Sequence, residues 1–166
     1  MSSHTRPRVI KQKPIKTIEM ELALFSFFDS RMRVIVPNVS YGMFSHELDL
    51  FMLTNSNYGI EIEIKIDKYD LIKDKEKRHG HKSKKLKHLY FAVPNYLVQY
   101  QEHIPLRAGI ISVTREKNDY LQVEIIKKPQ ATSAYQFTDL ECYKIVRLAS
   151  YRLWKHKREL WELKNK

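Results

Sequence analysis

The chain has 166 residues, 30 Lys and Arg against 19 Asp and Glu, a formal net charge of +11 and one cysteine. This length suits one domain with a hydrophobic core of its own. A single cysteine excludes an internal disulfide and a thiolate metal site, and it fits a reducing, cytoplasmic setting. No apolar run approaches the ~18 residues of a membrane span, and the first residues lack the apolar segment of a secretory signal.

Residues 1–13 are predicted to form a disordered basic tail, and 14–166 a single domain. The first helix is expected over 15–29, "IKTIEMELALFSFFD", where apolar side chains recur at helical spacing. We expect the buried side of this helix to contain Ile18, Leu22, Phe25 and Phe28. Glu21 falls on the same arc, which is unusual for a carboxylate.

Alternating or continuous apolar patterns predict the strands. They are expected at 33–37, 47–53, 60–66, 88–93, 108–113 and 120–126, the last at a sheet edge, with a hairpin turn at "TNSNYG". Further helices are expected at 67–78, at 95–103 and from about residue 139 to 163. Thr138 and Glu141 form a capping-box pattern for the last helix. This order predicts an α/β fold, a mixed central sheet flanked by helices.

The segment "IEIEIKI" shows the clearest alternation in the chain. Residues 61, 63 and 65 share one face of this strand, and the isoleucines at 60, 62, 64 and 66 share the other. If 47–53 pairs with 60–66 as a hairpin, Asp49 and Glu63 face the same side. Two interpretations are open: a solvated face with cross-strand ion pairs, or a metal site.

The residues of a metal site for hydrolysis are all present in the metal interpretation: two carboxylates and an ammonium group. Two neighbouring carboxylates repel each other unless a cation lies between them, and Mg²⁺ prefers such oxygen ligands. Lys65, two residues after Glu63, would lie beside the same ion, where it can act on a metal-bound water or on a phosphate. Asp49, Glu63 and Lys65 are therefore candidate residues for phosphodiester hydrolysis.

Basic residues cluster directly after this strand. From Lys65 to His88 there are ten Lys or Arg and four acids, and "HKSKKLKH" (81–88) contains no acid. Phosphate contacts give affinity without sequence recognition, so we expect a nucleic-acid partner, DNA before RNA. A solvated charged helix is the alternative for 67–78. The residues expected to bind DNA are Lys73, Lys77, Arg78, Lys82, Lys84, Lys85 and Lys87.

These motifs resemble the PD-(D/E)XK nuclease superfamily, in which an Asp on one strand precedes (D/E)-x-K on the next. Asp49 matches the first position, and "EIK" (63–65) matches the second. The ordered motifs "EIK…DLIKD…LYFAVP…GII", over residues 47–113, are similar to MmcB-type DNA-repair proteins within that superfamily.

The resemblance implies a restriction-endonuclease-like core of the order αβββαβ with an added C-terminal helix. It implies one or two Mg²⁺ (or Mn²⁺) ions held by Asp49, Glu63 and the Ile64 carbonyl, with Lys65 acting on the nucleophilic water. Glu21 would approach from the first helix to orient water or Lys65. The activity implied is a DNA endonuclease of repair or recombination. A catalytically silent DNA-binding accessory protein and an RNA-directed nuclease stay open as alternatives.

Other polar residues have a simpler expected role. Glu61 is expected to pair with a surface lysine, with membership of the site as the alternative. Ser45 and His46 are expected to lie in a loop, with contact to a phosphate or a metal-bound water as the alternative. His79 and His81 are expected to be loop residues without a metal. The last helix, with its two tryptophans, is a candidate core element or homodimer interface.

Overall fold

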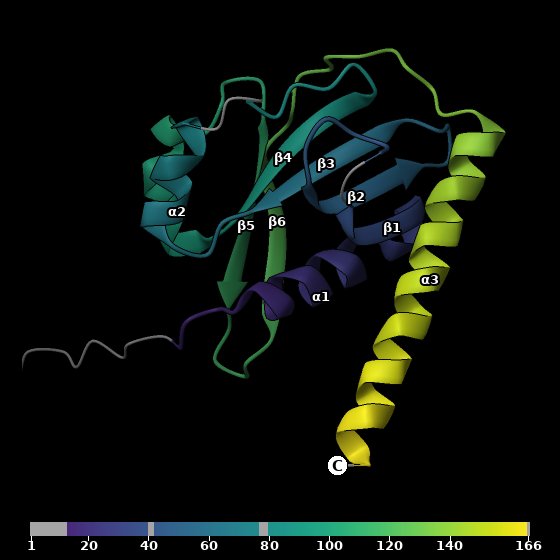
Figure 1. The fold of residues 1–166 in the computed structure, drawn as a ribbon. Helices are drawn as coiled ribbons and strands as arrows, with labels where there is room; N and C mark the ends of the chain where they lie inside the picture. Colours follow the sequence, from purple (N-terminus) through teal and green to yellow (C-terminus); the bar gives the residue numbers. More distant parts are fainter. Residues whose placement is uncertain (1–12, 40–41, 77–79, 166) are drawn as a thin grey trace, which may run out of the picture.

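The structure is a computed structural model that describes residues 13–39, 42–76 and 80–165 (Figure 1). The predicted tail thus lies outside the described residues except for Lys13. One six-stranded sheet in the order β1-β2-β3-β4-β5-β6 is flanked by helices, so the predicted α/β class and mixed sheet are confirmed. The elements are α1 (Thr17–Phe28), η1 (Asp29–Arg31), β1 (Met32–Val39), β2 (Leu48–Thr54), β3 (Gly59–Ile64), α2 (Lys68–Lys73), η2 (Asp74–Glu76), β4 (Leu86–Pro94), η3 (Asn95–His103), β5 (Gly109–Arg115), β6 (Leu121–Lys127) and α3 (Asp139–Lys164).

The sheet combines three antiparallel pairs of consecutive strands with a parallel centre. β1, β2 and β3 pair antiparallel, β3, β4 and β5 pair parallel, and β6 returns antiparallel at the edge. The two parallel connections contain α2 and η3, as crossovers between parallel strands require. The carboxyl ends of β3, β4 and β5 therefore lie at one end of the sheet, the usual place for ligand sites in such folds.

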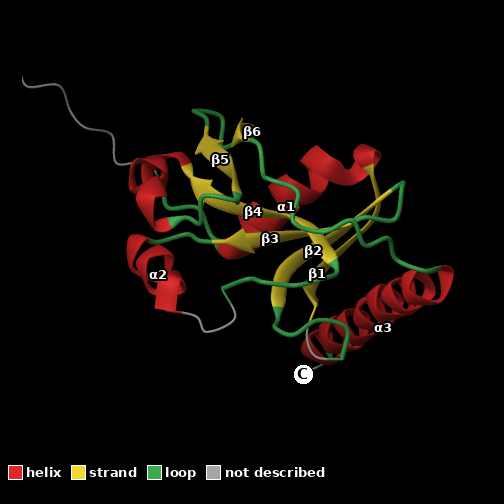
Figure 2. Ribbon diagram, turned by 90° about the horizontal axis from the view of Figure 1, so that it is seen from above, coloured by secondary structure: helices red, strands yellow, loops and turns green. Residues whose placement is uncertain are grey.

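The two faces of the sheet are covered differently. α1 packs on one face, where Met20 and Leu24 meet Leu50, Ile62 and other apolar side chains of the strands. The opposite face holds two apolar clusters, one beneath the start of α3 and one beneath α2 and η3. α2 and α3 lie at opposite ends of the sheet in both views (Figures 1 and 2).

The predicted buried side of α1 is correct for Phe28 and wrong for the other three residues. Met20, Leu24 and Phe28 are buried, whereas Ile18, Leu22 and Phe25 are exposed. Apolar residues surround most of this helix, so periodicity alone does not select a side. The side that packs contains Met20, Leu24 and Phe28, which are four residues apart. It contacts the isoleucine face of β3.

The capping box that begins α3 is confirmed. Thr138 N donates to Glu141 Oε2 at 2.9 Å, Glu141 N donates to Thr138 Oγ1 at 3.3 Å, and Phe137 is buried beside them. The second half of α3 extends beyond the sheet (Figure 1), and Trp154 and Trp161 are exposed. They are therefore not core residues, and the homodimer interface stays a prediction. Across the described residues, no helix combines the length and apolarity needed to cross a bilayer.

Two matched substitutions test which side of α1 is buried. Leu24→Ala, at 0% exposure, is expected to lower the free energy of unfolding by about 2–5 kcal/mol, because it leaves a cavity. Leu22→Ala makes the same chemical change at a 60% exposed site and is expected to change it by less than about 0.5 kcal/mol. Urea unfolding measures both, and an equal loss in the two variants would contradict the packing.

Candidate metal centre

The polar face of β3 is buried. Glu61 is 0%, Glu63 2% and Lys65 3% exposed. Every residue of β3 is buried, so both faces of this strand are covered. A solvated surface with weak ion pairs is therefore excluded for these side chains. The charged residues lie on the sheet face opposite α1, between the two apolar clusters of that face.

Asp49 and Glu63 lie directly across from each other. Leu50 pairs with Ile62, so the antiparallel register sets Asp49 opposite Glu63 and on the same face. Asp49 Oδ2 also accepts a hydrogen bond of 2.8 Å from Ile64 N. This bond holds the half-buried Asp49 carboxylate against the Ile64 N–H at the end of β3, at a register position across from Glu63.

Lys65 is held by carboxylates. Its Nζ lies 2.7 Å from Glu63 Oε1, 3.0 Å from Asp74 Oδ1 and 3.4 Å from Asp70 Oδ2. Burial alone lowers the pKa of this amine, but the charges and hydrogen bonds of Glu63 and Asp74 outweigh burial and raise the pKa above its ordinary value. Lys65 is therefore an ammonium at neutral pH.

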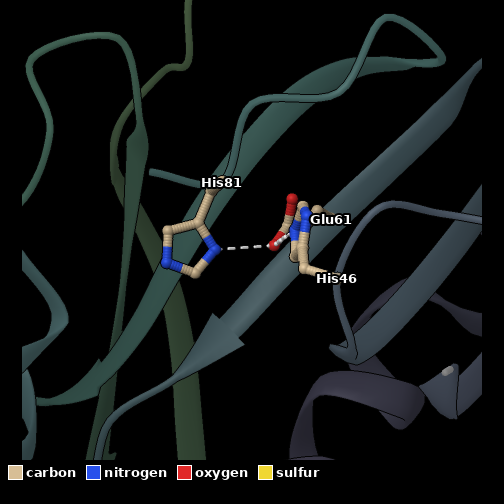
Figure 3. Close-up of side chains that lie close together, drawn as sticks. All are labelled: His46, Glu61 and His81. Atoms are coloured by element: carbon tan, nitrogen blue, oxygen red, sulfur yellow. Dashed lines mark hydrogen bonds and ion pairs between the residues drawn. The ribbon is translucent and has the colours of Figure 1, made fainter. Parts of the chain in front are cut away.

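Glu61 lies between two imidazole rings (Figure 3). His46 Nε2 and His81 Nδ1 lie 2.9 and 2.8 Å from the same oxygen, Oε1 of Glu61. Burial raises the pKa of Glu61, but the bonds to the two histidines outweigh burial and lower it. Asp74 joins the group through Oδ2, which lies 2.7 Å from His81 Nε2. Glu61 and His81 thus connect to Lys65 through Asp74.

The backbone at His81 has an uncommon conformation. Gly80 and His81 have φ angles of 50° and 53°, in the left-handed region that non-glycine residues rarely adopt. Arg107 Nη2 donates to the carbonyls of Gly80 and His81 at 2.7 and 3.0 Å. These bonds hold the turn that directs the His81 ring toward β3.

Glu21 does not join this group. It lies half-buried on α1, which packs on the opposite face of the sheet, and burial raises its pKa. The structure therefore does not bring Glu21 together with Glu63 and Lys65. The family resemblance implied that Glu21 approaches the site, and it does not because α1 covers the isoleucine face of β3 and not the face of Glu63.

The predicted DNA-binding residues differ in exposure. Lys73, Lys82 and Lys84 are exposed, while Lys77 and Arg78 lie outside the described residues. Lys85 Nζ lies 2.6 Å from Glu141 Oε1, and Lys87 Nζ lies 3.5 Å from the centre of the Tyr58 ring. Hollows beside the loop after His81 are lined by Ser45, Lys82, Ser83, Lys84, Arg107 and Thr132. Lys82 and Lys84 are thus the exposed lysines of the predicted set that line both hollows.

Sequence reasoning gave too small a role to three residues. Glu61 is not a surface ion-pair partner, and His46 and His81 are not free loop residues, since they are 6% and 4% exposed. Alternation already set Glu61 on the face of Glu63. No local signal marks His46 or His81, because their positions depend on a loop before β2 and on the left-handed turn at Gly80.

Comparison with known proteins finds a similar fold but indicates no function. No protein-family model matches the chain, and no curated protein matches it. Among solved structures, it is similar to the SPO1766 protein of unknown function from Silicibacter pomeroyi, with a TM-score of 0.59 and 13% sequence identity over 95% of this chain and 97% of that one. The two chains share a fold over nearly their whole length.

The charge on His81 predicts a pH-dependent stability. Burial lowers the His81 pKa, but hydrogen bonds to Asp74 and Glu61 and the charges of Glu61 and Glu63 raise it from 6.5 to about 9. A raised folded-state pKa contributes stability fully below the unfolded value, and this is lost as pH rises through the folded value. The difference in unfolding free energy between wild type and His81→Gln should thus be largest below pH 6.5 and shrink toward about pH 9.

Denaturant unfolding at a series of pH values measures this difference. His156→Gln, at an exposed site on α3, is the control and should show no such trend. The groups that face His81 are Glu61, Glu63, Asp74 and His46. A difference that stays constant from pH 6 to pH 9.5 would contradict a charged His81.

Proposed function

We propose that this protein is a metal-dependent nuclease of the PD-(D/E)XK type that hydrolyses phosphodiester bonds in DNA. The observation that favours it most is the joint position of Asp49, Glu63 and Lys65. The two carboxylates oppose each other on adjacent strands, and the ammonium lies 2.7 Å from one of them. The element order up to β4 and the mixed sheet agree with a restriction-endonuclease-like core.

The donor atoms suit magnesium. Asp49 and Glu63 offer carboxylate oxygens at opposed positions, and the Ile64 carbonyl follows directly in the chain. Such hard oxygen donors are the ligands that Mg²⁺ takes, with water and phosphate completing its shell. When bound, the ion would supply a Lewis acid and lower the pKa of a coordinated water.

The residues of the chain have separable roles in this proposal. Asp49 is oriented by the Ile64 N–H, and Glu63 by the Lys65 ammonium. Because its pKa is raised, Lys65 keeps its proton at neutral pH and acts as a positive charge and hydrogen-bond donor, and not as a base. It therefore stabilises charge on the phosphate or orients the attacking water. Lys82 and Lys84 would hold the backbone of the nucleic acid beside this centre.

A cleavage assay tests the activity directly. Purified protein with Mg²⁺ or Mn²⁺ is expected to cleave DNA. Asp49→Asn, which removes the charge of a metal ligand, and Lys65→Ala, which removes the positive charge beside the phosphate, are each expected to lower the rate by about 10²–10³-fold. Lys117→Ala, at an exposed turn, is the matched control and should keep the wild-type rate. Circular dichroism confirms that each variant is folded.

A DNA-binding accessory protein without turnover is the second candidate. The observation that favours it is the near-complete burial of Glu63 and of Lys65, whose ammonium is already held by Glu63 and Asp74. DNA binding without cleavage by wild type under any divalent ion would support this candidate over the nuclease. Cleavage of RNA in preference to DNA at equal salt would instead make RNA the substrate.

The contribution of the exposed lysines is measurable from salt dependence. Lys82→Ala with Lys84→Ala is expected to weaken DNA binding and to reduce the slope of log K against log salt by about 2, near 0.9 for each lost phosphate contact. Lys117→Ala with Lys128→Ala removes the same charge from two other exposed sites. An equal change of slope in both pairs would contradict a specific role for the loop after His81.

A further inference from the structure

We propose that His46, Glu61 and His81 form a second metal site, separate from the Asp49–Glu63 pair, which takes a divalent transition ion such as Zn²⁺. The three side chains come from the loop before β2, from β3 and from the turn before β4, and each is buried. Their ligand atoms all lie within 4.8 Å of one another. Figure 3 shows both rings directed at the Glu61 carboxylate.

The carboxylate of Glu61 has an oxygen left for a cation. Oε1 of Glu61 faces both histidines, whereas Oε2 is buried and has no hydrogen-bond partner among the described residues. A buried carboxylate oxygen without a partner is costly, so such atoms are rare unless a ligand satisfies them. A cation bound by both oxygens of Glu61, with Oε1 facing the two rings, would remove this cost.

Each histidine has its second ring nitrogen held by another group. His81 Nε2 lies 2.7 Å from Asp74 Oδ2, and His46 Nδ1 lies 3.3 Å from Ser45 Oγ. A histidine that binds a metal through one ring nitrogen almost always forms a hydrogen bond through the other, often to a carboxylate. This bond fixes the orientation of the ring. The arrangement at His81 matches a carboxylate–histidine–metal triad.

A second set of donors, Glu63, Asp74 and His81, is equally compact. Its two carboxylates already share a cation, because Lys65 Nζ lies 2.7 Å from Glu63 and 3.0 Å from Asp74. At Glu61 the ion-pair partners among the described residues are the imidazoles of His46 and His81, and a divalent ion bound by these rings would replace their protons. The position for an added ion is therefore at Glu61 and not between Glu63 and Asp74.

The donor set selects the ion. Two imidazoles and one carboxylate suit Zn²⁺ and its neighbours, whereas Mg²⁺ prefers oxygen alone. Two ligands at 2.0–2.1 Å from a tetrahedral ion lie about 3.3 Å apart, so each ring needs to move about 0.5 Å from Glu61 Oε1. Three protein ligands leave a fourth position for water or a phosphate oxygen.

Zinc titration of the full chain, stripped of metal with a chelator, tests the proposal. Wild type is expected to bind one tight equivalent. Glu61→Gln should weaken this binding by about 100-fold or more, since losing a ligand costs at least as much as losing its outer partner. His156→Gln and Asp49→Asn should keep the wild-type affinity, the first as a surface histidine and the second as the other proposed site. Unchanged affinity in Glu61→Gln, or a loss in Asp49→Asn, would overturn the assignment.

Ring-nitrogen NMR of wild-type protein decides the case if Glu61→Gln does not fold. One equivalent of Zn²⁺ is expected to shift the resonances of His46 and His81 while His103 and His156 stay in place. Shifts in a different pair of histidines would overturn the proposal. The test of zinc binding does not depend on nuclease activity. Asp49→Asn tests the proposed cleavage of DNA, whereas Glu61→Gln tests the proposed binding of zinc.

Discussion

The carboxylates Glu61, Glu63 and Asp74 are packed together with almost no solvent contact, and this is the constraint on which the site depends. Like charges at such short range destabilise a fold unless cations lie between them. Lys65 supplies one cation between Glu63 and Asp74, and His81 supplies another between Asp74 and Glu61. The raised pKa values of Lys65 and His81 are the consequence of that neutralisation.

The sheet explains why these charges meet. Lys65 N donates to Ala92 O at 3.0 Å, so the ladder between β3 and β4 continues past Ile64 and keeps Lys65 on the face of Glu63. The antiparallel partner β2 presents Asp49 to the same point. α1 covers the other face, which leaves the charged part of the polar face between the start of α3 and α2, beside the loop that contains Lys82 and Lys84. The charged face of β3 and this basic loop are thus neighbours, because His81 lines the same hollow as Lys82 and Lys84.

Strand alternation was sufficient to predict part of this site. Asp49, Glu63 and Lys65 were placed on one face because side chains alternate strictly in a strand and the hairpin is short. Periodicity was less reliable for α1, where apolar residues occur around most of the helix and give no preferred side. Glu21 was misplaced because the sequence does not show which face of the sheet α1 covers. His46 and His81 were not predictable, because a loop and a left-handed turn bring them to Glu61 and neither has a periodic pattern.

The most direct measurement is a crystal structure of the protein soaked in Mn²⁺, with anomalous diffraction to locate the ion. The account predicts a peak on the polar face of β3, about 2.0–2.2 Å from carboxylate oxygens of Asp49 and Glu63. A well-ordered polar face with no anomalous peak, or peaks only at exposed acids elsewhere, would contradict the claim that these buried charges form a metal centre.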